Sequence, residues 1–522
     1  MLFILRCLSG KWTCLFYEDN FRISGDKKVR YGGNGKMRIL MLDLDTLRPD
    51  HLHCYGYERE TSPVIDSICE DGMRFENYHC SDAPCLPSRA ALLTGRFGIH
   101  NGAVNHGGMA ADLRLRGIDR DFQNQDLTNG LFYLFRKANF YTASVSTFAE
   151  RHSSYWFQSG FHEIMNCGKC GGEMVDDVLP TALDWLERKG ESDNWFLHIN
   201  LWDAHTPYRT PLEYGNPFEN DPMPAWLTED VVKEHLKHVG PHGLNEIGMY
   251  TDDFARNFPR QLGKATNLKE VKQIVDGYDC GIRYMDEKIG EIIRFLKEKN
   301  LYEDMAIIVT SDHGENIGEF GIYSEHGTAD EITTRVPMII KWPGMKKGVE
   351  KGFHYNIDLC PTIAELLGQP IYEKWDGQSY AETLKTGEET GHPYLVVSQC
   401  SHVCQRAVRF DDYIYIRTYH DGFHLFPVEQ LYDLKNDYHE QHNLAEEKPE
   451  LCAKACRYLV DWEQEMMKKG DSDVDPLWTV MKEGGPYHAK GNLAKYYERL
   501  KQTGREEGAE KLKEMYPEEF KR

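Results

Sequence analysis

The stretch RILMLDLD, residues 38–45, contains an apolar run that ends in two aspartates at alternate positions. A short run of this kind is typical of a strand that is buried on both faces of a parallel sheet. Because alternate residues of a strand point to one face, we expect Asp43 and Asp45 to converge at its carboxyl end. Carboxylate oxygens are the ligands that hard cations prefer. Aspartates that cap a following helix are the alternative interpretation.

Outward from this strand, short apolar runs alternate with helical patterns. The pattern predicts further strands at residues 142–145, 195–202, 306–311 and 337–342, and helices at residues 64–72, 127–138, 178–189, 268–297 and 358–367. This alternation predicts an α/β fold with a mostly parallel sheet sandwiched by helices.

The pattern of predicted strands and helices changes near residue 395. Residues 394–398, 407–410 and 413–418 look like antiparallel strands, and a charged helical tail follows from residue 448. We therefore expect a main domain over residues 37–395 and a smaller C-terminal α+β domain over residues 396–522. Because Met37 directly precedes the first strand, residues 1–36 are interpreted as an N-terminal extension or a misassigned start.

The 522-residue chain is acidic, with 83 Asp and Glu against 61 Lys and Arg and a net charge of −22. Such a field repels nucleic acid and anionic membranes, so neither is an expected partner. Fourteen cysteines scattered over this length do not suggest a disulfide scaffold and favour a reducing compartment. No convincing signal peptide is visible, and no apolar stretch is long enough to span a bilayer. We therefore expect a cytoplasmic protein.

Two further polar groups follow predicted strands, at the edge where open α/β sheets bind ligands. Asp312 and His313 lie in TSDHGE and offer an oxygen and a nitrogen ligand, although turn chemistry also explains them. His205 follows WFLHINLW, where it suits a general acid or a substrate contact, and a structural histidine is the alternative.

The segment CLPSRAALLTGR, residues 85–96, predicts a loop that runs into a helix, with Pro87 in the first turn and Gly95 at the end. Cys85 then lies at the positive helix N-terminus, which stabilises a nucleophile or a bound anion. Arg89, one turn later, projects back over the same end. A buried thiol that caps a helix is the alternative.

This string resembles the signature of the type I, formylglycine-dependent sulfatases, C-x-P-S-R followed by L-T-G-R. The resemblance covers nearly all of residues 37–445, including the opening DTLRPDHL, the late TRVPMIIKWPG and the C-terminal EQLYDL. It implies an alkaline phosphatase-like fold and hydrolysis of a sulfate ester. In this family the cysteine is oxidised to formylglycine after translation, so a formylglycine-generating or radical-SAM maturation enzyme is an implied partner.

The resemblance also implies roles for the residues at the strand ends. The implied ligands of a divalent cation, usually Ca²⁺ with Mg²⁺ or Mn²⁺ open, are Asp43, Asp45, Asp312, His313 and the modified Cys85. The hydrated aldehyde attacks sulfur, the metal and Arg89 stabilise charge, and His205 protonates the leaving oxygen. An unmodified cysteine cannot perform the final elimination that releases sulfate.

This chain departs from the family pattern in two places. Ser146-Thr147-Phe148-Ala149 stands where relatives have G-K-W-H, so the usual Lys is missing and Arg151 or His152 is expected to replace it. A late Lys is also absent, and we expect His326 to occupy its place in the sulfate pocket. His106 lies where relatives place a polar substrate contact.

These departures leave alternatives open. Phosphonate monoester and phosphodiester hydrolases share the fold, can use formylglycine and often carry Thr at the position of Thr147. A catalytically inactive relative that serves as a binding module is less favoured, because the nucleophile, Arg89 and the ligand positions are all present. We expect a sulfated small molecule or glycan as substrate, and a carbohydrate sulfate in particular; the sequence does not indicate the oligomeric state.

Overall fold

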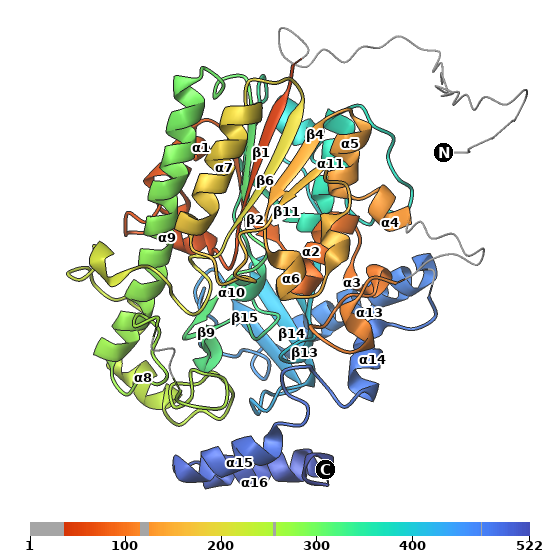
Figure 1. Cartoon of the computed structure of the whole chain (residues 1–522). Helices are drawn as coiled ribbons and strands as arrows, with labels where there is room; N and C mark the ends of the chain where they lie inside the picture. The colour runs from red at the N-terminus through yellow and green to blue at the C-terminus, as the bar shows by residue number, and fades with distance from the viewer. Residues whose placement is uncertain (1–35, 115–124, 254–256, 471, 522) are drawn as a thin grey trace, which may run out of the picture.

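The centre of the computed structural model, which describes residues 36–114, 125–253, 257–470 and 472–521, is an eight-stranded sheet (Figure 1). Of the predicted N-terminal extension, residues 1–35 lie outside the described residues. The strands, in sheet order, are β11 (Gly348–Tyr355), β2 (Met73–His79), β10 (Met338–Lys341), β7 (Ala306–Thr310), β1 (Arg38–Leu44), β6 (Trp195–Leu201), β4 (Tyr141–Val145) and β5 (Glu163–Met165). Every neighbouring pair is parallel except those of β10, which runs antiparallel to β7 and β2. The prediction of a mostly parallel sheet is confirmed.

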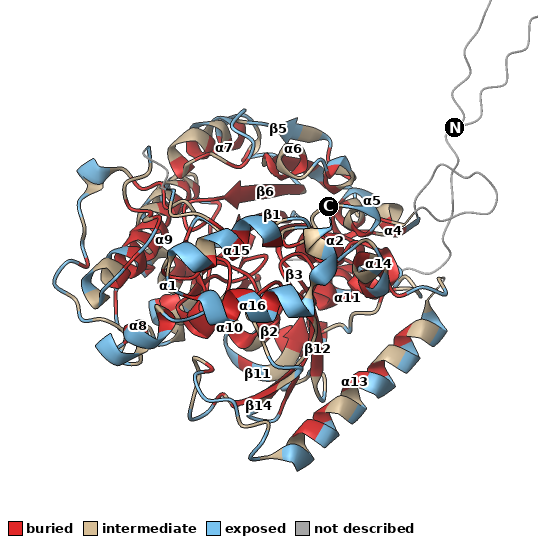
Figure 2. Cartoon of the chain, turned by 90° about the horizontal axis from the view of Figure 1, so that it is seen from below, coloured by how far each residue is buried: buried red, intermediate tan, exposed pale blue. Residues whose placement is uncertain are grey.

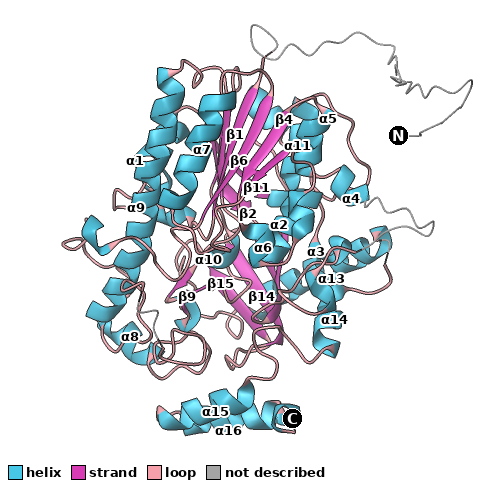
Figure 3. Cartoon of the chain, viewed as in Figure 1, coloured by secondary structure: helices cyan, strands magenta, loops and turns pink. Residues whose placement is uncertain are grey.

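Side chains of the sheet divide between two hydrophobic clusters according to their position along each strand. In β1, Leu40 and Leu42 belong to one cluster, and Ile39 and Met41 belong to the other. Helices cover both faces, as Figure 3 shows. The first face carries α1 (Pro63–Glu70), α7 (Val175–Lys189) and α9 (Leu268–Glu298), and the second carries α2 (Cys85–Thr94), α5 (Leu131–Lys137) and α11 (Leu359–Leu366). By the same alternation, Asp43 shares the face of Ile39 and Met41, which α2 covers.

The helix predicted over residues 127–138 is interrupted. The structure has α4 (Gln125–Thr128), then Asn129 and Gly130, and then α5. A Cβ on Gly130 would lie 2.7 Å from the backbone oxygen of Leu93 in α2, so the break lets two helices approach closely. The sequence pattern did not reveal this contact because it arises between segments far apart in the chain.

A second sheet has the order β15-β14-β13-β12-β3. Its strands are β15 (Glu429–Asp433), β14 (Tyr413–His420), β13 (Cys404–Phe410), β12 (Leu395–Gln399) and β3 (Asp82–Ala83). The three predicted C-terminal strands are present and antiparallel, whereas β3 comes from the residues just before Cys85 and pairs parallel to β12. The second sheet is therefore joined to the segment that carries the signature.

The described residues of the C-terminal part also form the α-helices α13 (Pro449–Lys469), α14 (Pro476–Lys482), α15 (Leu493–Gln502) and α16 (Glu506–Met515). Helix α13 buries one face and exposes the other (Figure 2). Its buried face carries Leu459 and Trp462, which join the core of the second sheet. Helices α15 and α16 form a separate layer (Figure 1), packed on Tyr250 and Phe423. No helix within the described ranges is both long and apolar enough to cross a membrane.

Two glycines of α9 give a matched test of how the long helix supports the loop after β6. A Cβ on Gly281 would lie 2.4 Å from the backbone oxygen of Asp203, whereas the nearest atom to a Cβ on Gly290 is a side-chain methyl of Val64 at 3.1 Å. Gly→Ala in a helix otherwise gains up to about 1 kcal/mol. We therefore expect Gly281→Ala to lower the free energy of unfolding by about 1–3 kcal/mol through overpacking, while Gly290→Ala leaves it unchanged or raises it. Denaturant unfolding of both variants checks this, and equal effects would contradict the close packing at Gly281.

Candidate active site

The carboxyl end of β1 presents Asp43 and Asp45 to the face of the sheet that α2 covers. Both carboxylates are buried. The backbone of Asp45 is held beside β6, because its N–H donates to the oxygen of Leu201 at 2.9 Å. The two aspartates therefore lie on one face at the sheet edge, as the alternation predicted.

The turn after β7 brings Asp312 and His313 to the same edge. Asp312 Oδ1 accepts hydrogen bonds from the backbone N–H groups of Thr46 (3.3 Å) and His313 (3.0 Å). His313 Nδ1 donates to the oxygen of Gly314 at 2.8 Å, so Nε2 carries the free lone pair in the neutral ring. Burial lowers the pKa of His313 to about 3 against the opposing effect of Asp312, so the ring is neutral at neutral pH.

Helix α2 begins at Cys85, whose Sγ lies 3.0 Å from Nε2 of His313. Burial raises the pKa of the Cys85 thiol to about 11, and Asp45 adds to the effect. A plain cysteine here is therefore protonated at neutral pH and a poor nucleophile. Ser88, a signature residue to which the sequence analysis gave no role, donates to the backbone oxygen of Asp312 at 2.6 Å and joins α2 to the β7 turn.

Arg89 lies one turn further along α2 and is fully buried among three carboxylates. Its Nε lies 3.0 Å from Asp43 Oδ2, one terminal nitrogen lies 3.0 Å from Asp45 Oδ2, and the other donates to Asp312. Three carboxylates against one guanidinium leave negative charge in a buried site. Burial in such surroundings is stable only when a further positive charge compensates it.

Asp45 is the carboxylate beside which this further positive charge is needed. Neither of its buried oxygens accepts a hydrogen bond of good geometry, despite the nearby Arg89. Burial, followed by repulsion from Asp312, raises the pKa of Asp45 well above its usual range. Ligand atoms of Asp45, Cys85, Asp312 and His313 all lie within 4.8 Å of one another. Oxygen-rich surroundings with one imidazole fit a divalent cation.

Asp43, the fifth expected ligand, lies beside this group rather than within it. Arg89 donates to both of its oxygens, at 3.0 and 3.1 Å, and His198 Nε2 lies 3.3 Å from Oδ2. Although burial opposes the shift, Arg89 and then His198 lower the pKa of Asp43 to about 2. His198 is a contact that the sequence analysis missed, since a single histidine within WFLHINLW gave no signal.

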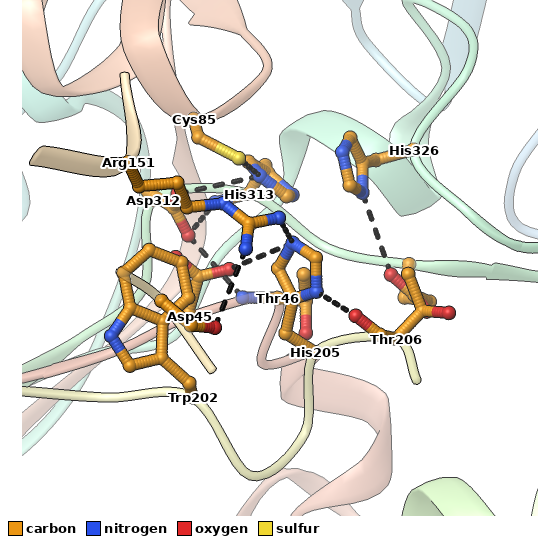
Figure 4. Close-up of polar contacts among 12 residues, drawn as sticks. Asp45, Thr46, Cys85, Arg151, Trp202, His205, Thr206, Asp312, His313 and His326 are labelled. Atoms are coloured by element: carbon orange, nitrogen blue, oxygen red, sulfur yellow. Dashed lines mark hydrogen bonds and ion pairs between the residues drawn. The ribbon is translucent and has the colours of Figure 1, made fainter. Parts of the chain in front are cut away.

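His205 and Arg151 lie close to Asp45 (Figure 4). His205 Nδ1 donates to the backbone oxygen of Thr206, and its Nε2 lies 3.2 Å from an Arg151 nitrogen and 3.9 Å from Asp45 Oδ1. Burial, with Arg151 next, lowers the pKa of His205 well below its usual range. Arg151 also lies over the ring of Trp202, 5.1 Å from its centroid. The structure thus brings two of the predicted catalytic residues together.

His326 packs against His313, with ring centroids 4.1 Å apart. Its Nε2 lies 2.9 Å from Glu325 Oε1 and its Nδ1 lies 3.5 Å from Glu315 Oε2. Although burial opposes the shift, Glu325 raises the pKa of His326 well above its usual range, so the ring carries a positive charge. The two glutamates were missed from the sequence, although Glu325 directly precedes the predicted His326.

Thr147, His152 and His106 are the remaining predicted residues. The hydroxyl of Thr147 donates to Glu173 at 2.7 Å and accepts from the backbone N–H of Gly171. The ring of His152 lies 5.1 Å from that of His106, and its buried Nε2 has no hydrogen-bond partner. His106 Nδ1 lies 3.0 Å from Nε2 of His488.

Comparison with known proteins agrees with this geometry. The sulfatase family model matches residues 39–369, and a model for the C-terminal part of N-sulphoglucosamine sulphohydrolase matches residues 318–461. An N-acetylglucosamine-6-O-sulfatase of Bacteroides thetaiotaomicron is 23% identical over 85% of this chain and 89% of its own length.

Solved structures show the same fold. BT4656 in complex with its substrate, D-glucosamine-2-N,6-O-disulfate, has a TM-score of 0.66 at 20% identity, covering 85% of this chain and 99% of that one. A phosphonate monoester hydrolase from Silicibacter pomeroyi has a TM-score of 0.63 at 20% identity, covering 85% and 97%. The expectation of an alkaline phosphatase-like fold is confirmed. Because the sulfatase model matches more than half of the sequence, this chain belongs to the sulfatase family of sulfuric ester hydrolases.

Proposed function

We propose that the chain hydrolyses a sulfate ester of a carbohydrate, with a formylglycine made from Cys85 as the nucleophile. The observation that carries the proposal is the convergence of Cys85, Asp45, Asp312 and His313 at the N-terminus of α2. A maturation enzyme, either the oxygen-dependent or the radical-SAM type, is needed to produce the aldehyde. The protonated and buried thiol supports this requirement, because without oxidation the site has no strong nucleophile.

Asp45, Asp312, His313 and the modified Cys85 are proposed to hold a divalent cation. Ca²⁺ is favoured by the carboxylates, and Mg²⁺ or Mn²⁺ are the alternatives. When bound, the cation supplies positive charge to the oxygens of the sulfuryl group and of the hydrated aldehyde. Asp43 lies behind these ligands and orients Arg89 through its two hydrogen bonds.

Three cationic side chains are proposed to recognise the sulfate group. Arg89 lies one turn into α2, Arg151 lies beside His205, and protonated His326 lies against His313. Arg151 is proposed to replace the missing family Lys, and His326 the late one. Positive charge aimed at the sulfuryl oxygens stabilises the charge that develops on them in the transition state.

His205 is proposed to protonate the leaving oxygen. The hydrogen bond from Nδ1 to Thr206 fixes the ring, so that Nε2 faces Asp45 and Arg151. A bound sulfate anion between Arg151 and His205 raises the pKa of the ring and so favours the acid form. His152 carries an unpartnered Nε2 and is proposed as the neutral base for the final elimination.

A carbohydrate substrate is supported by two relatives, an N-acetylglucosamine-6-O-sulfatase and a protein crystallised with a disulfated glucosamine. Tyr155, shortly after α6 (Phe148–Arg151), is 61% exposed and offers an aromatic surface to a sugar. The second candidate is a phosphonate monoester hydrolase. It is favoured by the fold likeness to the Silicibacter pomeroyi enzyme, which matches the same share of this chain.

The nucleophile is tested by co-expression with a maturation enzyme and mass spectrometry of the peptide that contains Cys85. We expect the mass of formylglycine, and we expect Cys85→Ala to lose nearly all activity because no other residue can form the aldehyde. A panel of sulfated sugars, aryl sulfates and phosphonate monoesters then separates the two functions. Plain cysteine, under conditions that convert a control sulfatase, would sink the mechanism, and a preference for phosphonate esters would favour the second function.

The role of His205 is tested by the dependence of turnover on the leaving group. We expect His205→Ala to slow sugar sulfates by about 10²–10⁴-fold but nitrophenyl sulfate far less, because nitrophenolate leaves without a proton. His53→Ala is the matched control, since His53 Nδ1 also bonds a backbone oxygen, that of Tyr57, but lies outside the site. An equal loss for both leaving groups would indicate a binding role instead.

The cation site is tested by Asp45→Asn, with bound metal and thermal unfolding as readouts. Added Ca²⁺ should stabilise the metal-free wild type, by about 2.7 kcal/mol at a hundredfold excess over Kd. The variant should lose this response, yet its metal-free form should unfold at a higher temperature, because a neutral amide removes the repulsion from Asp312 that the Asp45 carboxylate experiences when no metal is bound. Asp286→Asn is the control, since Asp286 accepts two backbone hydrogen bonds in the helical core: stability should fall and the metal response should remain. An undiminished response in Asp45→Asn would remove Asp45 from the ligands.

A further inference from the structure

A second cluster of potential ligands lies outside the Cys85 group and is made of three histidines from distant segments. His106 follows α3 (Gly98–Asn101), His402 follows β12, and His488 lies between α14 and α15. One ring nitrogen of each lies within 4.8 Å of the others. None of the three histidines is assigned a role in the sulfate chemistry proposed above.

The three rings of the cluster are in direct contact. His106 Nδ1 lies 3.0 Å from His488 Nε2, which is a hydrogen-bond distance, and the ring of His402 stacks on that of His488 with centroids 4.2 Å apart. Nitrogen ligands about 2.0–2.1 Å from a tetrahedral zinc ion lie roughly 3.4 Å from one another. The second ring nitrogen of His106, Nε2, is buried and has no hydrogen-bond partner among the described residues.

The backbone holds His488 in place independently of its side chain. Its N–H donates to the oxygen of Ser401 at 3.0 Å, and its own oxygen accepts from the hydroxyl of Tyr250 at 2.7 Å. The first contact also fixes His488 against the residue that precedes His402. Two of the three histidines are therefore positioned together before any ion binds, as a preorganised site requires.

A carboxylate lies next to the cluster. Glu325 Oε1 lies 3.7 Å from Nε2 of His402, and its Oε2 lies 3.2 Å from Nε2 of His242. A carboxylate beside a ligating histidine orients the ring and balances the charge of the ion.

We propose that His106, His402 and His488 form a second metal site, selective for Zn²⁺ or a similar borderline cation, with Glu325 as the adjacent carboxylate. Three imidazoles suit zinc, whereas Ca²⁺ and Mg²⁺ take oxygen ligands. The site is therefore chemically distinct from the carboxylate group at Asp45 and Asp312.

The position of this site indicates its purpose. His402 lies 5.8 Å from the ring of His326, and His106 lies 5.1 Å from that of His152. A zinc ion here joins three parts of the chain: the loop after α3, the second sheet and the segment that leads into α15. The ion would therefore stabilise the positions of His326 and His152, the two neighbouring residues proposed to act on the sulfate ester.

The test is the zinc content and zinc affinity of the full chain, measured by elemental analysis and by competition with a chromophoric chelator. We expect one equivalent of zinc in the wild type, retained in Asp45→Asn, which removes only the proposed Ca²⁺ site. His488→Gln and His106→Gln should each lose the zinc, while Glu325→Gln should weaken its binding by about 10–100-fold. His238→Gln is the control, because the Nδ1 atom of His238 bonds the oxygen of Phe320 and His238 is not part of the cluster, so zinc binding should be unchanged.

Two histidine variants are used so that the test still works if one of them fails to fold. Circular dichroism shows whether each variant is folded. A wild type that binds no zinc after removal and readdition of the metal would overturn the proposal. Folded His488→Gln and His106→Gln proteins that bind zinc as tightly as wild type would overturn it as well. Neither outcome touches the proposed sulfatase function, which depends on Cys85 and the other cation.

Discussion

The buried charge of Arg89 and its three carboxylates constrains the rest of the structure. Asp43 and Asp45 come from the end of β1, Asp312 comes from the turn after β7, and all three meet one guanidinium. Charges removed from water are stable only with close partners, so β1, β7 and α2 have little freedom in their relative placement. Ser88 adds a neutral hydrogen bond to the same junction. The excess of negative charge that remains is what suits the site to a cation.

This constraint explains why the signature helix begins where it does. With Arg89 drawn to the sheet edge, the first residue of α2 is brought against His313, and the positive end of the helix faces the reacting group. The two residues of β3, just before Cys85, pair with β12 and tie this helix to the second sheet. From that sheet, Gln399 donates to the backbone oxygen of His326 at 3.0 Å and holds it near Cys85. The smaller sheet therefore shapes the active site as well as supporting the fold.

Much of this was readable from sequence because it depends on short-range regularities. Strand alternation placed Asp43 and Asp45 on one face, and the alternating apolar runs predicted the layers of the large sheet. The antiparallel direction of β10 and the break at Gly130 were not predicted, because both follow from contacts between segments far apart in the chain. The hydrogen bond between Thr147 and Glu173 was not predicted either, since the two residues are 26 positions apart in the sequence.

The local sequence was sufficient for the chemistry of each part: a cysteine at a helix start, an arginine one turn later, and acidic residues at strand ends. Such features depend on periodicity and on residue type, which folding does not alter. Which side chains are ionised, and which side chains contact one another, was decided only by the tertiary structure. Glu325 makes His326 a cation, whereas burial keeps His313 neutral, although both are histidines in polar loops. Likewise, nothing near His106, His402 or His488 in the sequence indicates that they meet, because more than 380 residues separate the first from the last. Burial and charge depend on neighbours, and the neighbours are set by the tertiary fold.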